Sequence, residues 1–183
     1  MNFTARSESA RSESARSESA HPADPGPSRS FGPAFLLAQL GSHAARRFAE
    51  RLAKLRLQPA HSGILYSVAG TPGLTQQALA RRLGMVPSRL VALLDELDGR
   101  GLIQRSTDPG DRRRHALLLT EKGKKALAAI GDLSREHQHV LLAALSSAEQ
   151  QQLANLLQRI ADQQGLTRNV HPGYKTLRPP RET

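Results

Sequence analysis

Residues 74–120 read LTQQALARRLGMVPSRLVALLDELDGRGLIQRSTDPGDRRRHALLLT, and this stretch decides the fold. Thr75 is suited to cap a short helix, and Gly84 suits the left-handed position that ends it. A second helix is predicted from near Pro87 to about Arg100. Two short helices joined by a turn of roughly three residues have the spacing of a helix-turn-helix.

A β-hairpin is predicted directly after these helices. Residues 102–107 and 114–120 read as strands, and the four residues from Asp108 to Asp111 are turn formers. Three consecutive arginines follow this turn, so the tip of the hairpin is basic. A helix-turn-helix followed by such a hairpin is the pattern of a winged helix.

Helical periodicity extends on both sides of this unit. Apolar residues recur every three or four positions from Pro33, and Pro59 suits the first position of a second helix. Thr120 is suited to cap a long helix, and Ser146 with Glu149 forms a capping box for a last one. The predicted fold class is therefore mainly α with a small β-hairpin: a winged helix-turn-helix plus a helical region.

The formal net charge of the 183-residue chain is +10, from 26 Lys and Arg against 16 Asp and Glu. Half of this charge lies in residues 99–125, which include the arginine run. Clustered positive charge is an electrostatic footprint for phosphate. Aromatic residues are only 3% of the chain and tryptophan is absent, which argues against a stacking platform for single-stranded nucleic acid.

Several classes of function are excluded or disfavoured. The chain has no cysteine, which excludes disulfides, thiolate metal sites and a thiol redox switch. No apolar run is long enough to span a bilayer and no secretory signal is evident, so we expect a cytoplasmic protein with no membrane contact. Hydrolase and nucleotide-binding motifs are absent, so we expect no enzyme. Glu136 and His139 share a helix face, but no further ligand is indicated, and we expect neither metal nor cofactor.

The first turn of the Pro87 helix is expected to read DNA bases in the major groove. Arg89 can donate two hydrogen bonds to a guanine, and Ser88 can bond to a base or a phosphate. The arginines of the hairpin suit a narrow, negative minor groove. Asp111 is placed to orient the guanidinium of Arg113.

Three stretches resemble the multiple antibiotic resistance regulator (MarR) family. Residues 74–84 are similar to its helix-turn-helix entry, and residues 97–105 to the end of its recognition helix and its first wing strand. Residues 108–114, followed by Leu117 to Gly123, match its wing signature. The resemblance covers about residues 33–163.

This resemblance implies a homodimer that binds double-stranded DNA, with Asp111 and Arg113 as the wing pair and Arg105 as the strand residue that braces it. It also implies a sequence-specific transcriptional regulator, in most members a repressor, that binds a palindromic operator. Many members release DNA when a small aromatic or phenolic effector binds. The expected DNA-binding residues are Thr75, Gln76, Pro87, Ser88, Arg89, Arg105, Asp111, Arg112, Arg113 and Arg114.

Two departures from the family pattern bear on base readout. Val86 stands where the family often has a polar cap, and Ala92 and Glu96 replace positions that are often polar or basic. Candidate lining groups for an effector cleft are His43, Arg47, His61 and Tyr66. A low-specificity architectural DNA-binding protein, using the same wing and basic tails, remains an alternative.

The expected organisation has five parts. They are a disordered low-complexity tail over residues 1–32 with three Ala-Arg-Ser-Glu-Ser repeats, a dimerisation helix over 33–58, the winged helix-turn-helix over 59–120, dimerisation helices over 121–165, and a flexible basic tail over 166–183.

Overall fold

The computed structural model describes residues 31–108 and 111–175, apart from the side chains of residues 107–115, Pro172 and Lys175. The predicted tail over residues 1–32 therefore lies outside the described residues, except for its last two. The elements are α1 (Pro33–Ala53), α2 (Pro59–Gly70), β1 (Leu74–Thr75), α3 (Gln76–Leu83), α4 (Pro87–Gly99), β2 (Ile103–Asp108), β3 (Asp111–Leu119), α5 (Glu121–Leu141), α6 (Ser147–Gln163) and the 3₁₀ helix η1 (Pro172–Lys175).

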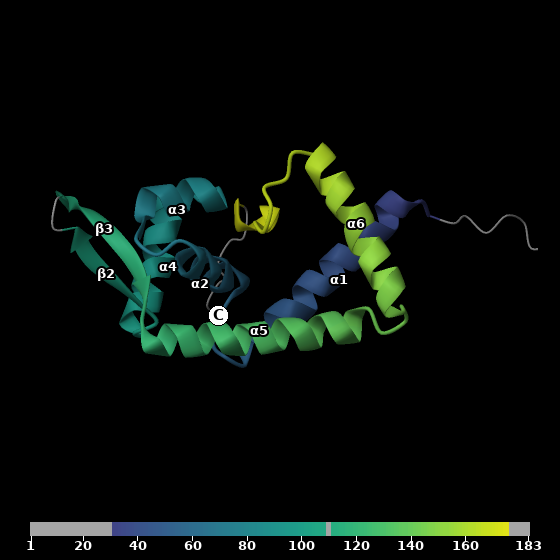
Figure 1. Ribbon diagram of the computed structural model, residues 1–183, viewed down its shortest axis with the longest axis horizontal. Coiled ribbons are helices and arrows are strands. Elements are labelled where there is room, and N and C mark those ends of the chain that lie inside the picture. Colours follow the sequence, from purple (N-terminus) through teal and green to yellow (C-terminus); the bar gives the residue numbers. More distant parts are fainter. Residues whose placement is uncertain (1–30, 109–110, 176–183) are drawn as a thin grey trace, which may run out of the picture.

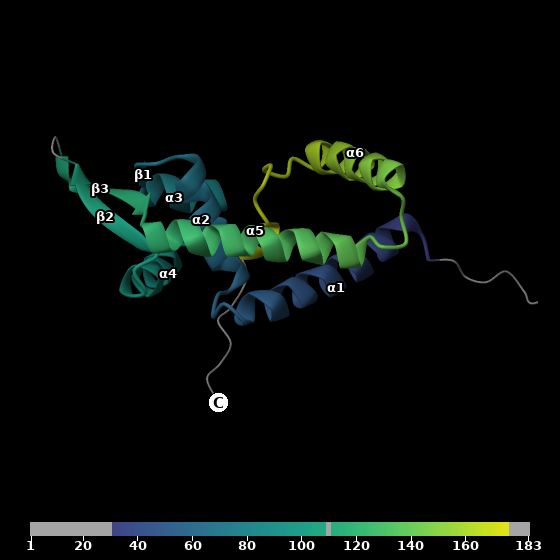
Figure 2. The same ribbon diagram turned by 60° about the horizontal axis from the view of Figure 1, so that its bottom comes forward.

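The molecule has one compact lobe from which long helices extend. Helices α2, α3 and α4 pack together with the sheet, and α1 and α5 run side by side away from them (Figure 1). In the view of Figure 2, α6 and α1 lie on opposite sides of α5. The predicted class, mainly helical with a small antiparallel sheet, is confirmed.

The core lies where α2, α3 and α4 meet. Each of these helices contributes leucines that water does not reach, and Leu52 of α1 and Ile130 of α5 close the cluster from the extended side. The apolar positions of the predicted helices therefore divide into two groups. Those near the lobe are buried, whereas those at the far ends of α1 and α6 stay exposed.

The predicted helix caps are present. The hydroxyl of Thr75 accepts a hydrogen bond from the amide of Ala78, Thr120 accepts one from Gly123, and Ser146 forms its capping box with Glu149. Gly84 ends α3 with a φ of 62°. These caps depend on residues within three positions along the chain, which is why local sequence predicts them.

The sheet differs from the prediction in two respects. It has three strands in the order β1-β3-β2, because Leu74 and Thr75 pair with Leu117 and Ala116. The hairpin strands also reach Asp108 and Asp111, so the turn is shorter than the four residues predicted. A two-residue strand has no periodicity of its own and forms only because β3 offers a free edge.

Residues 166–175 belong to the tail over 166–183 that the sequence predicts to be flexible and basic, and its flexibility stays a prediction. The chain after α6 folds back onto the lobe, and Tyr174 is only 8% exposed within the core cluster. The contact depends on one aromatic side chain, Tyr174, packing against α2. A single buried residue gives the sequence no apolar periodicity, so the contact could not be predicted from it. Within residues 31–108 and 111–175, no helix has the length and apolar character needed to cross a bilayer.

Candidate nucleic-acid interface

The helix-turn-helix consists of α3, the turn at Gly84 and α4. The apolar face of α4 packs into the core, which leaves the opposite face of its first turn in solvent. Pro87 and Ser88 are exposed there. Val86 precedes the helix, at the position where the family often has a polar cap, and provides no side-chain cap. The start of α4 is therefore favoured only by Pro87, which occupies the first helical position.

Thr75 and Gln76 lie where α3 begins. The hydroxyl of Thr75 is 3.2 Å from the amide nitrogen of Ala78, so it is engaged as the cap of α3. Gln76 is half-buried in the first turn. Gln76 lines a surface pocket together with Pro87, so the starts of α3 and α4 share one hollow of the surface.

Arg105 joins the wing to α4. Its guanidinium Nη2 donates a hydrogen bond to Asp95, and its Nε lies 4.0 Å from a carboxylate oxygen of Asp98. Both aspartates are on α4 and are partly exposed. The contact neutralises acidic groups that would otherwise repel a DNA backbone beside the helix.

The wing residues Asp111, Arg112, Arg113 and Arg114 lie in β3. Their backbone belongs to the antiparallel ladder, in which Asp108 faces Asp111 and Thr107 faces His115. Their side chains lie outside the described residues, so the predicted pairing of Asp111 with Arg113 stays a prediction.

Arg89 lies in the first turn of α4 but is half-buried. Its guanidinium Nη1 is 3.4 Å from the backbone carbonyl oxygen of Tyr174, to which it donates a hydrogen bond. The predicted base-reading side chain is therefore engaged by the segment that follows α6. Sequence reasoning missed this partner because the two residues are 85 positions apart.

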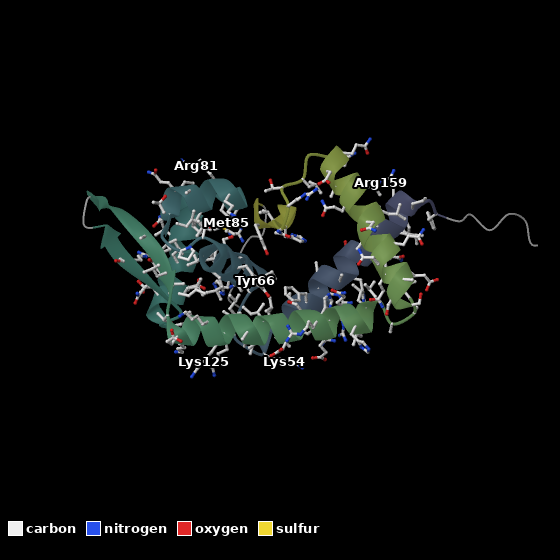
Figure 3. All side chains as sticks on the ribbon, viewed as in Figure 1. Lys54, Tyr66, Arg81, Met85, Lys125 and Arg159 are labelled. Atoms are coloured by element: carbon white, nitrogen blue, oxygen red, sulfur yellow. The ribbon has the colours of Figure 1, made fainter. Side chains whose placement is uncertain are left out.

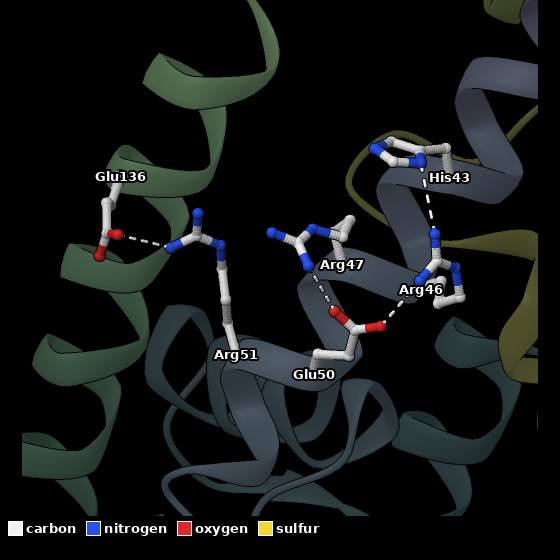
Figure 4. A network of polar contacts seen from close by, with 6 residues as sticks. All are labelled: His43, Arg46, Arg47, Glu50, Arg51 and Glu136. Atoms are coloured by element: carbon white, nitrogen blue, oxygen red, sulfur yellow. Dashed lines mark hydrogen bonds and ion pairs between the residues drawn. The ribbon is translucent and has the colours of Figure 1, made fainter.

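The four candidate cleft residues do not come together. His43 and Arg47 lie on α1 in a polar network, in which Arg46 and Arg47 both donate to Glu50 and Arg46 contacts His43 (Figure 4). The same network contains the bond from Arg51 to Glu136, 2.6 Å long, which joins α1 to α5. The Arg51 guanidinium lowers the pKa of the Glu136 carboxyl.

His61 is a structural residue of the lobe. Its side chain is 2% exposed, its Nδ1 accepts a hydrogen bond from the amide of Gln58 at 3.2 Å, and its Nε2 lies 3.0 Å from a carboxylate oxygen of Glu96. Burial lowers the pKa of His61 below its ordinary value, despite the opposing effect of Glu96. The residue thus caps α2 and contacts α4, and its burial leaves no surface for an effector.

Tyr66 is the one of the four that lines a large cavity. A cavity of about 780 Å³ lies between α2, β3 and α5. Its walls are mainly apolar, and Lys124 and Arg135 of α5 lie on its edge together with Tyr66. Figure 3 shows Tyr66 on the lobe side of the space above α5. Gly131 of α5 also lines this cavity, and a Cβ atom there would lie 3.5 Å from Nη1 of Arg135 and 3.9 Å from the Tyr66 hydroxyl.

Comparison with known proteins agrees with this architecture. The family model described as MarR family matches residues 57–114, which cover the lobe from the end of α1 to the wing. A putative transcriptional regulatory protein for the hcr operon of Thauera aromatica is 35% identical over 140 residues, covering 72% of this chain and 84% of that protein.

Two solved structures extend the comparison. The transcriptional repressor CouR, bound to a 23-mer DNA duplex, is 33% identical with a TM-score of 0.64, covering 71% of this chain and 92% of that one. The PcaV transcriptional regulator from Streptomyces coelicolor is 27% identical with a TM-score of 0.62, covering 74% and 100%. The relatives named here are regulators of transcription rather than enzymes. The helix-turn-helix, the wing and the similarity to these relatives together show that the chain belongs to the MarR family of transcriptional regulators.

Proposed function

We propose that this protein is a homodimeric repressor that binds a palindromic operator through α4 and the wing. The observation that carries the proposal is the bond from Arg105 to Asp95, which ties the first wing strand to the C-terminal half of α4 and neutralises acidic charge on that helix. CouR, a repressor of similar fold bound to a DNA duplex, supports the same use of this surface.

The first turn of α4 is proposed to enter the major groove, with Ser88 and Arg89 near the base edges. The wing arginines, Arg112 to Arg114, are proposed to lie along the flanking minor groove, where Asp111 orients Arg113. The net charge of +5 over residues 99–125, which include the wing, supports this arrangement because clustered positive charge attracts the phosphate backbone.

Dimerisation is proposed to use the apolar faces of α1 and α6. Phe35, Leu36, Leu37 and Leu40 are exposed on the far half of α1, and Leu156, Leu157 and Ile160 are exposed on α6. Exposed apolar side chains gathered on helices that extend from the lobe are typical of an interface between subunits. A two-fold dimer places two recognition helices on one duplex, which a palindrome requires.

A small aromatic or phenolic acid is proposed to bind in the cavity that Tyr66 lines. The apolar wall accommodates a ring. Lys124 and Arg135 also line the cavity, and a ligand carboxylate would have to compete there with their present partners, Glu121 and Asp132. The cavity lies between α5 and the wing, so a ligand there would change how the extended helices meet the DNA-binding lobe. In this position an effector alters the spacing of the two recognition helices.

Selection of genomic fragments by the purified protein tests the proposed function. The proposal predicts enrichment of a short palindrome whose half-site centres are about 34–36 Å apart, one turn of the duplex. Enrichment of a single half-site with no inverted copy contradicts the dimeric mode. Recovery of fragments with no common sequence contradicts specific recognition and favours the architectural alternative.

A further inference from the structure

The chain after α6 returns to the lobe, as the yellow segment of Figure 1 shows. Its departure from α6 is fixed by an ion pair in which Arg168 Nη2 lies 2.8 Å from Asp162. Val170 then packs against the core cluster, and Tyr174 of η1 packs against α2. We call residues 166–174 the C-terminal strap. It connects a proposed dimerisation helix directly with the DNA-binding lobe.

The surface that receives Tyr174 is shaped for it. A Cβ atom on Gly63 of α2 would lie 2.7 Å from Cε2 of the Tyr174 ring, so the ring occupies the space that a side chain at position 63 would fill. Burial raises the pKa of the Tyr174 hydroxyl, while Ser62 opposes that change.

The strap also contacts the recognition helix. With Tyr174 seated on α2, its backbone carbonyl accepts the hydrogen bond from Arg89. Arg89 is half-buried, and its Nη1 lies 3.4 Å from that carbonyl oxygen. To donate two hydrogen bonds to a guanine, Arg89 must leave the carbonyl of Tyr174.

We propose that the C-terminal strap restrains Arg89 and thereby lowers the affinity of the protein for DNA. This inference rests on the proposed function, since it assigns Arg89 to the DNA interface. Tyr174 is then a positioning residue that acts through Arg89, and Gly63 is the residue that admits it. DNA binding and strap docking compete for one side chain. Release of the strap raises DNA affinity by the equivalent of one hydrogen bond, roughly three- to tenfold.

The test uses Gly63→Ala, which expels the Tyr174 ring without altering the strap itself. Gly70→Ala is the matched control, because Gly70 lies on the same helix and its added Cβ meets no atom within 4 Å. Docking is measured in a Tyr66→Phe background, where Tyr174 is the sole tyrosine. Titration of the phenol by ultraviolet absorbance should show a raised pKa in the parent and the Gly70 control, and an ordinary pKa with Gly63→Ala.

DNA affinity is then measured for the same variants with and without Arg89→Ala, on the selected fragment and on a mixed-sequence duplex. We expect Gly63→Ala to bind about fivefold more tightly than the parent, Gly70→Ala to match the parent, and the gain to vanish when Arg89 is replaced. An unchanged affinity despite a released phenol overturns the proposal, as does a gain that persists without Arg89. An ordinary phenol pKa in the parent overturns the docking itself.

Failure of the proposed function gives a different pattern. In that case the parent binds neither duplex above background, although its phenol still titrates as a buried group. If Gly63→Ala then remains unable to bind, the restraint on Arg89 has no role in DNA affinity and the inference falls with the function. If Gly63→Ala alone binds, the strap is a complete block rather than a partial one, and the inference stands.

Discussion

Arg105 in β2 donates a hydrogen bond to Asp95 in α4, and this contact ties the wing to the recognition helix. The two residues are 10 positions apart and come from different kinds of element. Because both side chains are partly exposed, the pair contributes little to the free energy of unfolding. Its proposed importance lies in the charge and orientation of the surface that we propose to contact DNA.

Replacement of Arg105 with alanine should therefore separate stability from DNA binding. We expect the free energy of unfolding to change by less than about 1 kcal/mol and DNA affinity to fall roughly tenfold, because Asp95 and Asp98 then face the phosphates without a counter-charge. Urea unfolding and a binding titration measure the two effects. Adding Asp95→Asn should restore part of the affinity, and no restoration would argue against charge as the cause.

Arg113 in the wing should contribute to affinity for every DNA sequence. Arg113→Ala is expected to weaken binding to specific and mixed duplexes alike, and to reduce the slope of log affinity against log salt by about one. Arg159→Ala is the matched control, since Arg159 lies on α6 far from α4 (Figure 3). Equal salt slopes for both variants would remove Arg113 from the interface.

Arg89 should affect sequence preference. Arg89→Ala is expected to relax the preference at one base pair in each half-site, at a cost of about 1–3 kcal/mol in discrimination. Selection from a randomised operator library measures the preference at each position. A profile identical to that of the parent would show that bases are read by other side chains.

The cavity beside Tyr66 should be needed for effector response but not for DNA binding. Gly131→Leu fills this cavity from α5, where the nearest neighbouring atom lies 3.5 Å from an added Cβ. A panel of hydroxybenzoates that releases the parent from DNA should fail to release this variant. Unimpaired release from Gly131→Leu would place the effector elsewhere.

Acid should destabilise the fold through His61, which is buried, and His137, which is partly exposed. Burial lowers the pKa of His61 and of His137 below 6.5, so the unfolded chain binds more protons below that pH. The contribution of these histidines to the free energy of unfolding should therefore be complete above about pH 6.5. It should decrease as the pH drops from there toward the pKa of each histidine in the folded protein. Urea unfolding across this range tests the sign.

The His61→Asn variant isolates the buried residue in that experiment. Its amide oxygen can still accept the hydrogen bond from Gln58, but it does not titrate. We expect a weaker pH dependence that retains the contribution of His137. A pH dependence as steep as that of the parent would mean that His61 titrates normally in the folded protein.

Sequence predicted the parts of this fold that depend on nearby residues. Thr75, Gly84 and Thr120 cap their helices because the groups that they satisfy lie within a few positions. The strap, by contrast, depends on Tyr174 meeting Gly63, 111 positions earlier, and no local pattern predicts such a match. His61 illustrates the same limit. Its residue type is suited to an effector cleft, but in the fold it is buried and therefore cannot line one.

The ratio of specific to non-specific affinity tests the central claim most directly. The protein is titrated, at one salt concentration, against its selected palindrome and against a duplex of the same composition with the half-sites scrambled. A MarR-family repressor acting through α4 and the wing predicts a ratio above about 10³ with one dimer bound per palindrome. A ratio near one, with strong salt dependence on both duplexes, would contradict the account and assign the protein to low-specificity DNA binding.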